Sequence, residues 1–212
     1  MSWPEIDLVV GQSATDHDLL RLRDAAALGA AVLASVGSRG CDVSVSGFED
    51  AQRESPTFQE QPNWCWAACL QAVLRHYGVD RKQGEIVSDV YGAPLDLPEL
   101  SPAQLYHVVN GEMTLADGTM CLVRGRYYSG DLLTPPVLYN ELRANHPVMA
   151  VQKTGDGTGH AVVIYGATFS PFGVVSVKYF DPTPGKGLAE VSGLSLGEVV
   201  RRWFAIRGTA LA

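Results

Sequence analysis

The chemically most telling residue is a cysteine between two tryptophans. In "QEQPNWCWAACLQAVLRHYG", residues 59 to 78, Cys65 lies at the first turn of a predicted helix, flanked by Trp64 and Trp66. The free N–H groups and the positive end of the dipole at a helix start favour a thiolate. Cys69 lies one turn further along and is predicted to be a small buried hydrophobe. Cys65 is therefore the candidate nucleophile.

A nucleophilic cysteine needs a base, and the base needs a group that orients it. His160 follows the glycine-rich "KTGDGTG" and opens the apolar run "AVVIYG"; the next apolar run, "VVSVKYF", ends at Asp181. If these runs form a β-hairpin, the start of one strand lies beside the end of the other. The pattern predicts that Asp181 orients His160.

Two other uses of the cysteines fit the spacing less well. Cys65 and Cys69 are separated by three residues, whereas a thioredoxin-type redox pair is separated by two. Cys65, Cys69 and His76 share a helix face, but His76 lies about 16 Å along the axis from Cys65. A single zinc ion with bonds of about 2 Å cannot bind all three. No metal site and no cofactor are predicted.

The remaining histidines are poorer candidates for the base. His76 is at the far end of the Cys65 helix, and His17 lies near the N-terminus. His107 is predicted within a helix and His146 in a turn before proline, and a surface role is expected for both.

A side-chain amide upstream of the nucleophile is expected to complete an oxyanion hole together with the backbone N–H of Cys65. Gln59 lies six residues before Cys65 and Gln61 lies four before, and both belong to a polar segment. Spacing alone leaves the choice between them open.

The elements that must position these residues are predicted as helices first and a sheet second, which favours an α+β fold. Three β-branched runs between residues 146 and 182 predict consecutive antiparallel strands, and residues 48 to 63 are predicted to be a loop. Other helices are predicted over residues 15–37, 64–77, 81–92, 101–111 and 134–145, other strands over 5–10, 41–47 and 120–128, and a closing helix and strand over 195–208.

Composition excludes several classes of protein. A net charge of −7 over 212 residues argues against nucleic-acid binding. The longest apolar stretch, residues 25 to 37, is too short to cross a bilayer, so no membrane insertion is expected. The four cysteines do not form a disulfide framework, and the N-terminal residues lack a secretory signal pattern. These features predict a cytoplasmic location or export by a route other than the general secretory one.

The segments "QEQPNWCWAA", "HAVVIYG" and "YFDPTPG" together resemble papain-like cysteine peptidases. They are most similar to a bacterial branch that includes the leader-processing peptidase domains of bacteriocin transporters and effector cysteine proteases of plant pathogens. The resemblance covers roughly residues 55 to 207. It implies a helical half and an antiparallel sheet half with the active site between them.

The resemblance also assigns roles. It implies Cys65 as nucleophile, His160 as base, Asp181 as orienting residue and Gln59 as oxyanion donor, because papain-like enzymes carry the glutamine six residues before the cysteine. Asp181 stands where papain itself has asparagine, as in the bacterial branch.

The resulting prediction is a cysteine peptidase that hydrolyses a peptide bond of a protein or peptide substrate through a thioester. Trp64 and Trp66 are predicted to shield the thiol and to form a wall of the substrate cleft or of the interface between the halves. Alternatives are acyl transfer by the same triad, as in a transglutaminase, and a peptidase-like binding module. Residues 1–54 are predicted to be an N-terminal extension, as a pro-segment or accessory structure, and 55–212 the peptidase domain. An effector or toxin is one setting for such an enzyme.

Overall fold

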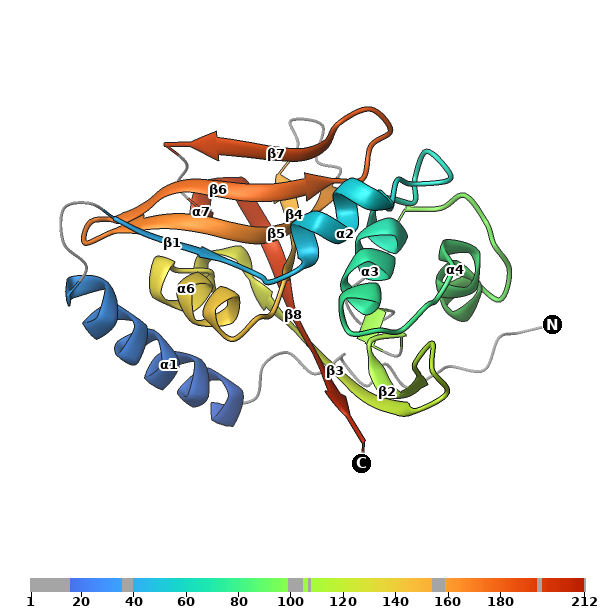
Figure 1. Cartoon of the computed structure of the whole chain (residues 1–212), viewed down its shortest axis with the longest axis horizontal. Helices are drawn as coiled ribbons and strands as arrows, with labels where there is room; N and C mark the ends of the chain where they lie inside the picture. The colour runs from blue at the N-terminus through green and yellow to red at the C-terminus, as the bar shows by residue number, and fades with distance from the viewer. Residues whose placement is uncertain are drawn as a thin grey trace, which may run out of the picture.

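The computed structural model describes residues 16–35, 40–98, 105–106, 108–153, 159–193 and 196–211. The fold is α+β, as predicted. Most of the helices precede all strands of a single antiparallel sheet except the first, short strand (Figure 1). The predicted strand over residues 5–10 lies outside the described residues, as do residues 101–104 and His107 of the predicted helix over residues 101–111.

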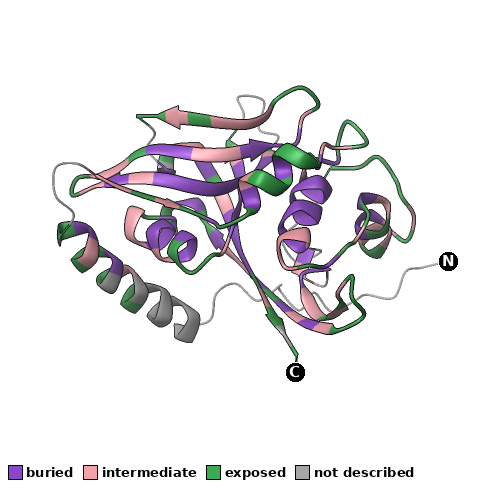
Figure 2. Cartoon of the chain, in the orientation of Figure 1, coloured by how far each residue is buried: buried purple, intermediate pink, exposed green. Residues whose placement is uncertain are grey.

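Helix α3 (Cys65–His76) is the structural centre of the helical half. Its residues from Trp66 to Leu74 are all buried, and most of the helix has the purple colour of buried residues in Figure 2. Gly78, at a φ of 84° that favours glycine, follows its C-terminus. The flanking helices are α1 (Asp16–Ser35), α2 (Phe48–Glu54) and α4 (Gln83–Tyr91).

The sheet has the strand order β2-β3-β8-β4-β5-β6-β7, and β1 pairs with β5 outside this path. Every neighbouring pair is antiparallel. The strands are β1 (Cys41–Ser44), β2 (Asn110–Thr114), β3 (Met120–Ser129), β4 (Val148–Lys153), β5 (Gly159–Ser170), β6 (Gly173–Asp181), β7 (Gly187–Ser192) and β8 (Val200–Ala210).

The predicted run of three consecutive antiparallel strands is confirmed as β4, β5 and β6. Val163 of β5 pairs with Phe180 of β6, and Gln152 of β4 pairs with His160 of β5. This register brings the beginning of β5 to the end of β6, where the predicted base and its orienting residue lie.

Helices α3 and α6 (Pro135–Arg143) both contact β5, and α1 packs on the side of α6 away from the sheet (Figure 1). Gly29 allows this close packing, because a Cβ there would lie 2.6 Å from the carbonyl oxygen of Pro136. Two short helices, η1 (Gly130–Leu132) and α7 (Leu196–Val199), flank strand β8.

The loop predicted over residues 48 to 63 is wrong in its first half, which forms α2. Phe48 is buried and stacks on Tyr165 of β5 with ring centroids 5.5 Å apart, and Val45 just before it is also buried. Residues 41–54 therefore share the core of the following residues. A division of the chain at residue 54 stays a prediction.

None of the described helices is long and apolar enough to cross a membrane.

Candidate active site

Cys65 is the first residue of α3 and is partly exposed. Trp64 precedes it as the N-cap residue, but its side chain forms no capping hydrogen bond, and the first turn contains no acidic residue. The first N–H groups of a helix have no acceptor within the helix, so they favour negative charge at this end. The local fold thus places the thiol where a thiolate or an oxyanion is stabilised.

His160 and Asp181 lie together at the paired ends of β5 and β6, as the hairpin prediction required. His160 Nε2 is 2.8 Å from Asp181 Oδ1. The side chain of Asp181 is only 8% exposed, whereas that of His160 is 23% exposed. The buried carboxylate holds one ring nitrogen, which leaves Nδ1 as the nitrogen available to the thiol.

The hydrogen bond between His160 and the Cys65 side chain is the largest influence on the imidazole. This contact raises the pKa of His160, burial lowers it, and the hydrogen bond and charge of Asp181 raise it further. The net direction is upward from the ordinary value of 6.5. The structure therefore favours an imidazolium beside the thiol, the arrangement that supports a thiolate.

Two neighbours fix the Asp181 carboxylate in addition to His160. The backbone N–H of Thr183 donates to Oδ1 at 2.9 Å, and Lys186 Nζ lies 3.2 Å from Oδ2. Burial raises the pKa of Asp181, but the hydrogen bonds of Thr183 and His160 outweigh it, so the carboxyl pKa lies below its ordinary value. Sequence reasoning missed Thr183 and Lys186, although both follow Asp181 in the glycine- and proline-containing turn.

Gln59 lies next to this turn but does not present a free amide. Its backbone N–H donates to the carbonyl of Pro182 at 2.8 Å, which joins the loop before Cys65 to the residue after Asp181. Its side-chain Nε2 donates to the carbonyl oxygens of Gln61 at 3.0 Å and Pro62 at 2.8 Å. The amide is near the helix start but engaged with its own loop.

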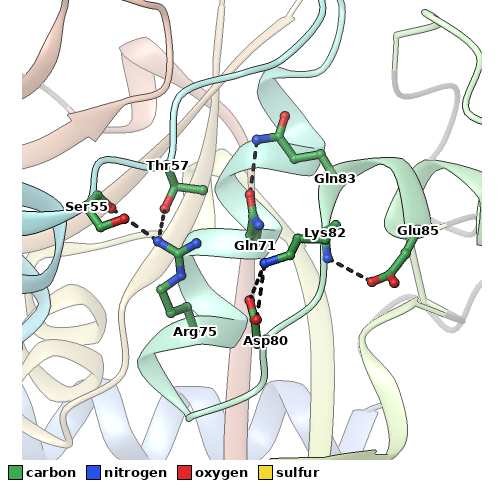
Figure 3. Close-up of polar contacts among 8 residues, drawn as sticks. All are labelled: Ser55, Thr57, Gln71, Arg75, Asp80, Lys82, Gln83 and Glu85. Carbon is green, nitrogen blue, oxygen red and sulfur yellow. Dashed lines mark hydrogen bonds and ion pairs between the residues drawn. The ribbon is translucent and has the colours of Figure 1, made fainter. Parts of the chain in front are cut away.

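Helices α3 and α4 hold this loop in place (Figure 3). Arg75 of α3 donates to the carbonyl of Ser55 and to the Thr57 hydroxyl. Gln83 of α4, which is 1% exposed, donates to Gln71 of α3 at 3.1 Å.

The same Gln83 amide also binds the backbone on each side of Gln59. It donates to the carbonyl of Phe58 at 2.8 Å and accepts from the N–H of Glu60 at 3.0 Å. Sequence reasoning did not anticipate this buried glutamine.

The two tryptophans are anchored in the protein rather than spread over its surface. Trp64 is 4% exposed and Trp66 is 1% exposed. Their indole N–H groups donate to the carbonyls of Leu95 at 2.9 Å and Leu97 at 3.2 Å. Burial leaves these rings little surface for a substrate, and direct contact with one stays a prediction.

Cys69 is fully buried in α3, and burial is the main reason why its thiol pKa lies well above the ordinary value. All four cysteines are free thiols. Cys41 is partly exposed, like Cys65, whereas Cys121 is buried. Only Cys65 combines exposure with a histidine partner among the described residues.

The model of the Peptidase_C39 like family matches residues 51–210. The chain belongs to this family. The match contains Cys65, His160 and Asp181 together with the α3 helix and the whole sheet except β1. Membership in this peptidase family indicates a cysteine peptidase, and the predicted relation to papain-like bacterial peptidases is confirmed.

A solved structure shares the fold of this C39-like chain. It is the crystal structure of the peptidase domain of Streptococcus ComA, a bi-functional ABC transporter involved in a quorum-sensing pathway. The two are 15% identical, the match covers 71% of this chain and 95% of the ComA domain, and the TM-score is 0.51. No curated protein matches the chain.

The other described histidine side chains of this C39-like protein, His76 and His146, have partners outside the Cys65 site. His76 Nε2 is 3.0 Å from the carbonyl oxygen of Asn145, and burial lowers its pKa. His146 Nδ1 is 3.1 Å from Glu141 Oε2, so the predicted surface role for His146 is at most partial. Its side chain is 24% exposed.

A cavity of about 230 Å³ lies on the sheet face that also carries His160. Val162 and Ile164 line it, and alternate residues of a strand share one face, so both lie on the His160 side of β5. Gln152, the register partner of His160, and Tyr179 also line it. Among the described residues, no three His, Cys, Asp or Glu side chains are grouped to hold a metal ion.

Proposed function

We propose that this chain hydrolyses a peptide bond with Cys65 as nucleophile, His160 as proton carrier and Asp181 as the residue that orients the imidazole. Family membership supports a cysteine peptidase, and the observation that carries the finer assignment is the arrangement around His160. One ring nitrogen is 2.8 Å from a buried carboxylate, while the ring also bonds the thiol at a helix start.

Acylation follows from these positions. The Cys65 thiolate attacks the substrate carbonyl carbon, a C–S bond forms, and the carbonyl π electrons move to oxygen as an oxyanion. The free N–H groups at the start of α3 lie at the correct end of the helix to stabilise that charge. The oxyanion then collapses, the C–N bond breaks, and the imidazolium of His160 gives its proton to the leaving amine.

Deacylation reverses the proton path. Water attacks the thioester, neutral His160 accepts a proton from it, and the C–S bond breaks to release a carboxylic acid and regenerate the thiolate–imidazolium pair. The Asp181 carboxylate stabilises the imidazolium in both halves of the cycle. Its own lowered pKa keeps it ionised throughout.

Gln59 is proposed as the second oxyanion donor, by way of a local rearrangement. Its amide must exchange the carbonyls of Gln61 and Pro62 for the substrate oxyanion. Substrate binding can drive such an exchange, because catalytic hydrogen bonds often form fully only in the enzyme–substrate complex.

A peptide-mixture assay tests this proposal. The protein is incubated with a proteome-derived peptide mixture in H₂¹⁸O, and new termini are identified by mass spectrometry, with Cys65→Ser as the inactive control and Cys69→Ser as the matched control. Hydrolysis places ¹⁸O in each new carboxyl group. New termini that are equally abundant with Cys65→Ser would contradict the proposal.

Adding an excess of a primary amine to the same assay separates hydrolysis from acyl transfer. Hydrolysis predicts ¹⁸O-labelled acids as the main products, whereas an acyltransferase yields amides of the added amine. Amides in excess over acids would replace the peptidase proposal by the acyl-transfer alternative.

A further inference from the structure

The segment of residues 93–98, "APLDLP", lies against the first turn of the nucleophile helix. Trp64 and Trp66, the residues on either side of Cys65, donate their indole N–H groups to the carbonyls of Leu95 and Leu97. These bonds attach two positions of the 93–98 segment to the two neighbours of the nucleophile. The segment is therefore part of the immediate surroundings of Cys65.

Asn63 and Tyr91 form further hydrogen bonds to the 93–98 segment. The backbone N–H of Asn63 donates to Asp96 Oδ1 at 2.9 Å, and the Asn63 side chain reaches the Asp96 carbonyl at 3.4 Å. The Tyr91 hydroxyl donates to the carbonyl of Pro98. The four carbonyls from residue 95 to residue 98 thus all accept a bond from the protein.

Two prolines add stiffness to the same segment. Pro94 and Pro98 have fixed φ angles, and each restricts the residue before it to extended conformations. A segment that is rigid before it meets a ligand loses little conformational entropy on binding. The 93–98 segment has this property at a site where peptides are proposed to bind.

Apart from Asp96, the side chains that the segment presents to solvent are apolar. Leu95 is 47% exposed and Leu97 is 37% exposed, whereas the tryptophans that hold them are buried. A single exposed leucine is ordinary on a protein surface. These two exposed leucines belong to a segment whose backbone is bonded to Trp64 and Trp66, so they form an apolar pair near the start of α3.

We propose that Leu95 and Leu97 are specificity-determining residues that contact an aliphatic side chain of the peptide substrate close to the scissile bond. This inference rests on the proposed peptidase function. An extended peptide advances about 3.3 Å per residue, so a surface adjacent to Cys65 meets a side chain within a few residues of the cleaved bond. Trp64 and Trp66 act as positioning residues, which hold the 93–98 segment rather than the substrate.

Covalent peptide probes test the proposal without knowledge of the natural substrate. The probes are an all-glycine tripeptidyl chloromethyl ketone and its analogues with one leucine at each position. The inactivation rate at Cys65 is measured by intact mass for each probe and divided by the iodoacetamide rate of the same variant. This ratio separates side-chain recognition from thiol reactivity.

The wild type is expected to react with at least one leucyl probe about tenfold or more faster than with the glycyl probe, the size of a few apolar methylene contacts. Leu95→Ser with Leu97→Ser is expected to remove most of this preference. Trp64→Phe, which keeps an aromatic ring but loses the indole N–H, is expected to reduce it by about 2- to 10-fold, the worth of one hydrogen bond. Val175→Ser is the matched control, because Val175 on β6 is 46% exposed.

The outcomes separate this inference from the proposed function. A reactive Cys65 that shows no leucyl preference overturns the inference alone. A preference that survives in the double leucine variant also overturns it, and directs attention to the cavity lined by Val162 and Ile164. A Cys65 that reacts no faster than Cys41 with iodoacetamide, in wild type and His160→Ala alike, overturns the proposed function and the inference with it.

Discussion

The molecule contains two histidine–carboxylate pairs of nearly the same construction. At the end of β5 and β6, His160 Nε2 is 2.8 Å from Asp181 Oδ1, and Lys186 contacts the same carboxylate at 3.2 Å. At the corner between α6 and β8, His146 Nδ1 is 3.1 Å from Glu141, which also binds Arg207 at 2.6 Å. Both carboxylates are buried, and both histidine side chains are about one quarter exposed.

The difference between the pairs is the group on the far side of the imidazole. His160 also bonds the Cys65 thiol at the start of α3, and this contact is the largest influence that raises its pKa. No described thiol is bonded to His146. The residue before it, Asn145, instead contacts His76 at the C-terminal end of α3. A buried histidine–carboxylate pair is therefore a common structural unit, and the nucleophile at a helix start makes one of them a candidate active site.

The largest expected effect comes from removing the two imidazoles in turn. His160→Ala is expected to lower the rate of peptide hydrolysis by about 1,000-fold or more, because no proton carrier remains at the thiol. His146→Ala is expected to keep the rate within about threefold. The measurement is the initial rate on a peptide found in the mixture assay. Similar losses in both variants would remove the distinction between the pairs.

The carboxylates give the next largest contrast. Asp181→Asn is expected to lower kcat by about 100-fold or more, because a neutral amide no longer stabilises the imidazolium or fixes its tautomer. Glu141→Gln is expected to leave kcat within about threefold. The kcat values of both variants are compared at pH 7, with circular dichroism to confirm the fold. An Asp181→Asn enzyme with wild-type kcat would show that the pairing at β6 is only structural.

A Gln59 variant tests whether a side-chain amide contributes to catalysis in addition to the proposed His160–Asp181 pair. Gln59→Ala is expected to lower kcat by about 100-fold through loss of one oxyanion donor, with no change in the alkylation rate of Cys65. Gln61→Ala is the matched control, because only the backbone carbonyl of Gln61 is used in the loop. If the two alanine variants have equal kcat, the Gln59 amide stays bound to its own loop during catalysis.

The smallest effect is on stability and belongs to the α6–β8 corner. Burial raises the pKa of Glu141, but His146 and Arg207 outweigh it, so the pKa lies below the ordinary value of 4.5. The stability that ionised Glu141 provides is therefore present above pH 4.5 and is lost as pH falls through the lower folded-state value.

Glu141→Gln is accordingly expected to lower the free energy of unfolding by about 1–3 kcal/mol at pH 7. The difference from wild type is expected to shrink as pH falls below 4.5 and through the lowered folded-state pKa, where the wild-type carboxyl is protonated. Urea titrations at pH 7 and at a series of acidic pH values measure it. A gap that stays constant with pH would mean that packing, not charge, is the contribution of Glu141.

The sequence was sufficient to predict that His160 and Asp181 lie together, because their position follows from strand pairing. His160 opens one apolar strand and Asp181 closes the next, so an antiparallel hairpin brings them together whatever the loop between them does. The start of the helix at Cys65 could also be predicted, because an amphipathic run follows it. Both predictions depend on the periodic spacing of apolar residues, which can be read directly from the sequence.

The features that were missed depend on contacts between distant segments. Glu141 lies five residues before His146, but only the turn after α6 folds the imidazole back onto it. Helix α2 was predicted as a loop because most of its residues are polar. The contact that orders it is the packing of Phe48 on β5, which the sequence pattern does not indicate. The orientation of the Gln59 amide depends on competition between loop carbonyls and a substrate, which spacing does not encode.

The central claim is that His160 activates Cys65, and alkylation tests it most directly. Iodoacetamide rates are measured at Cys65 and at Cys41, which is also partly exposed, from about pH 5 to pH 8 in wild type, His160→Ala and His146→Ala. Because the pKa of His160 is raised, the imidazolium persists up to and above pH 6.5, and it is expected to speed Cys65 alkylation by about tenfold or more near pH 5.5. That advantage should vanish in His160→Ala and remain in His146→Ala. A Cys65 that reacts at the rate of Cys41 in all three proteins would contradict the account.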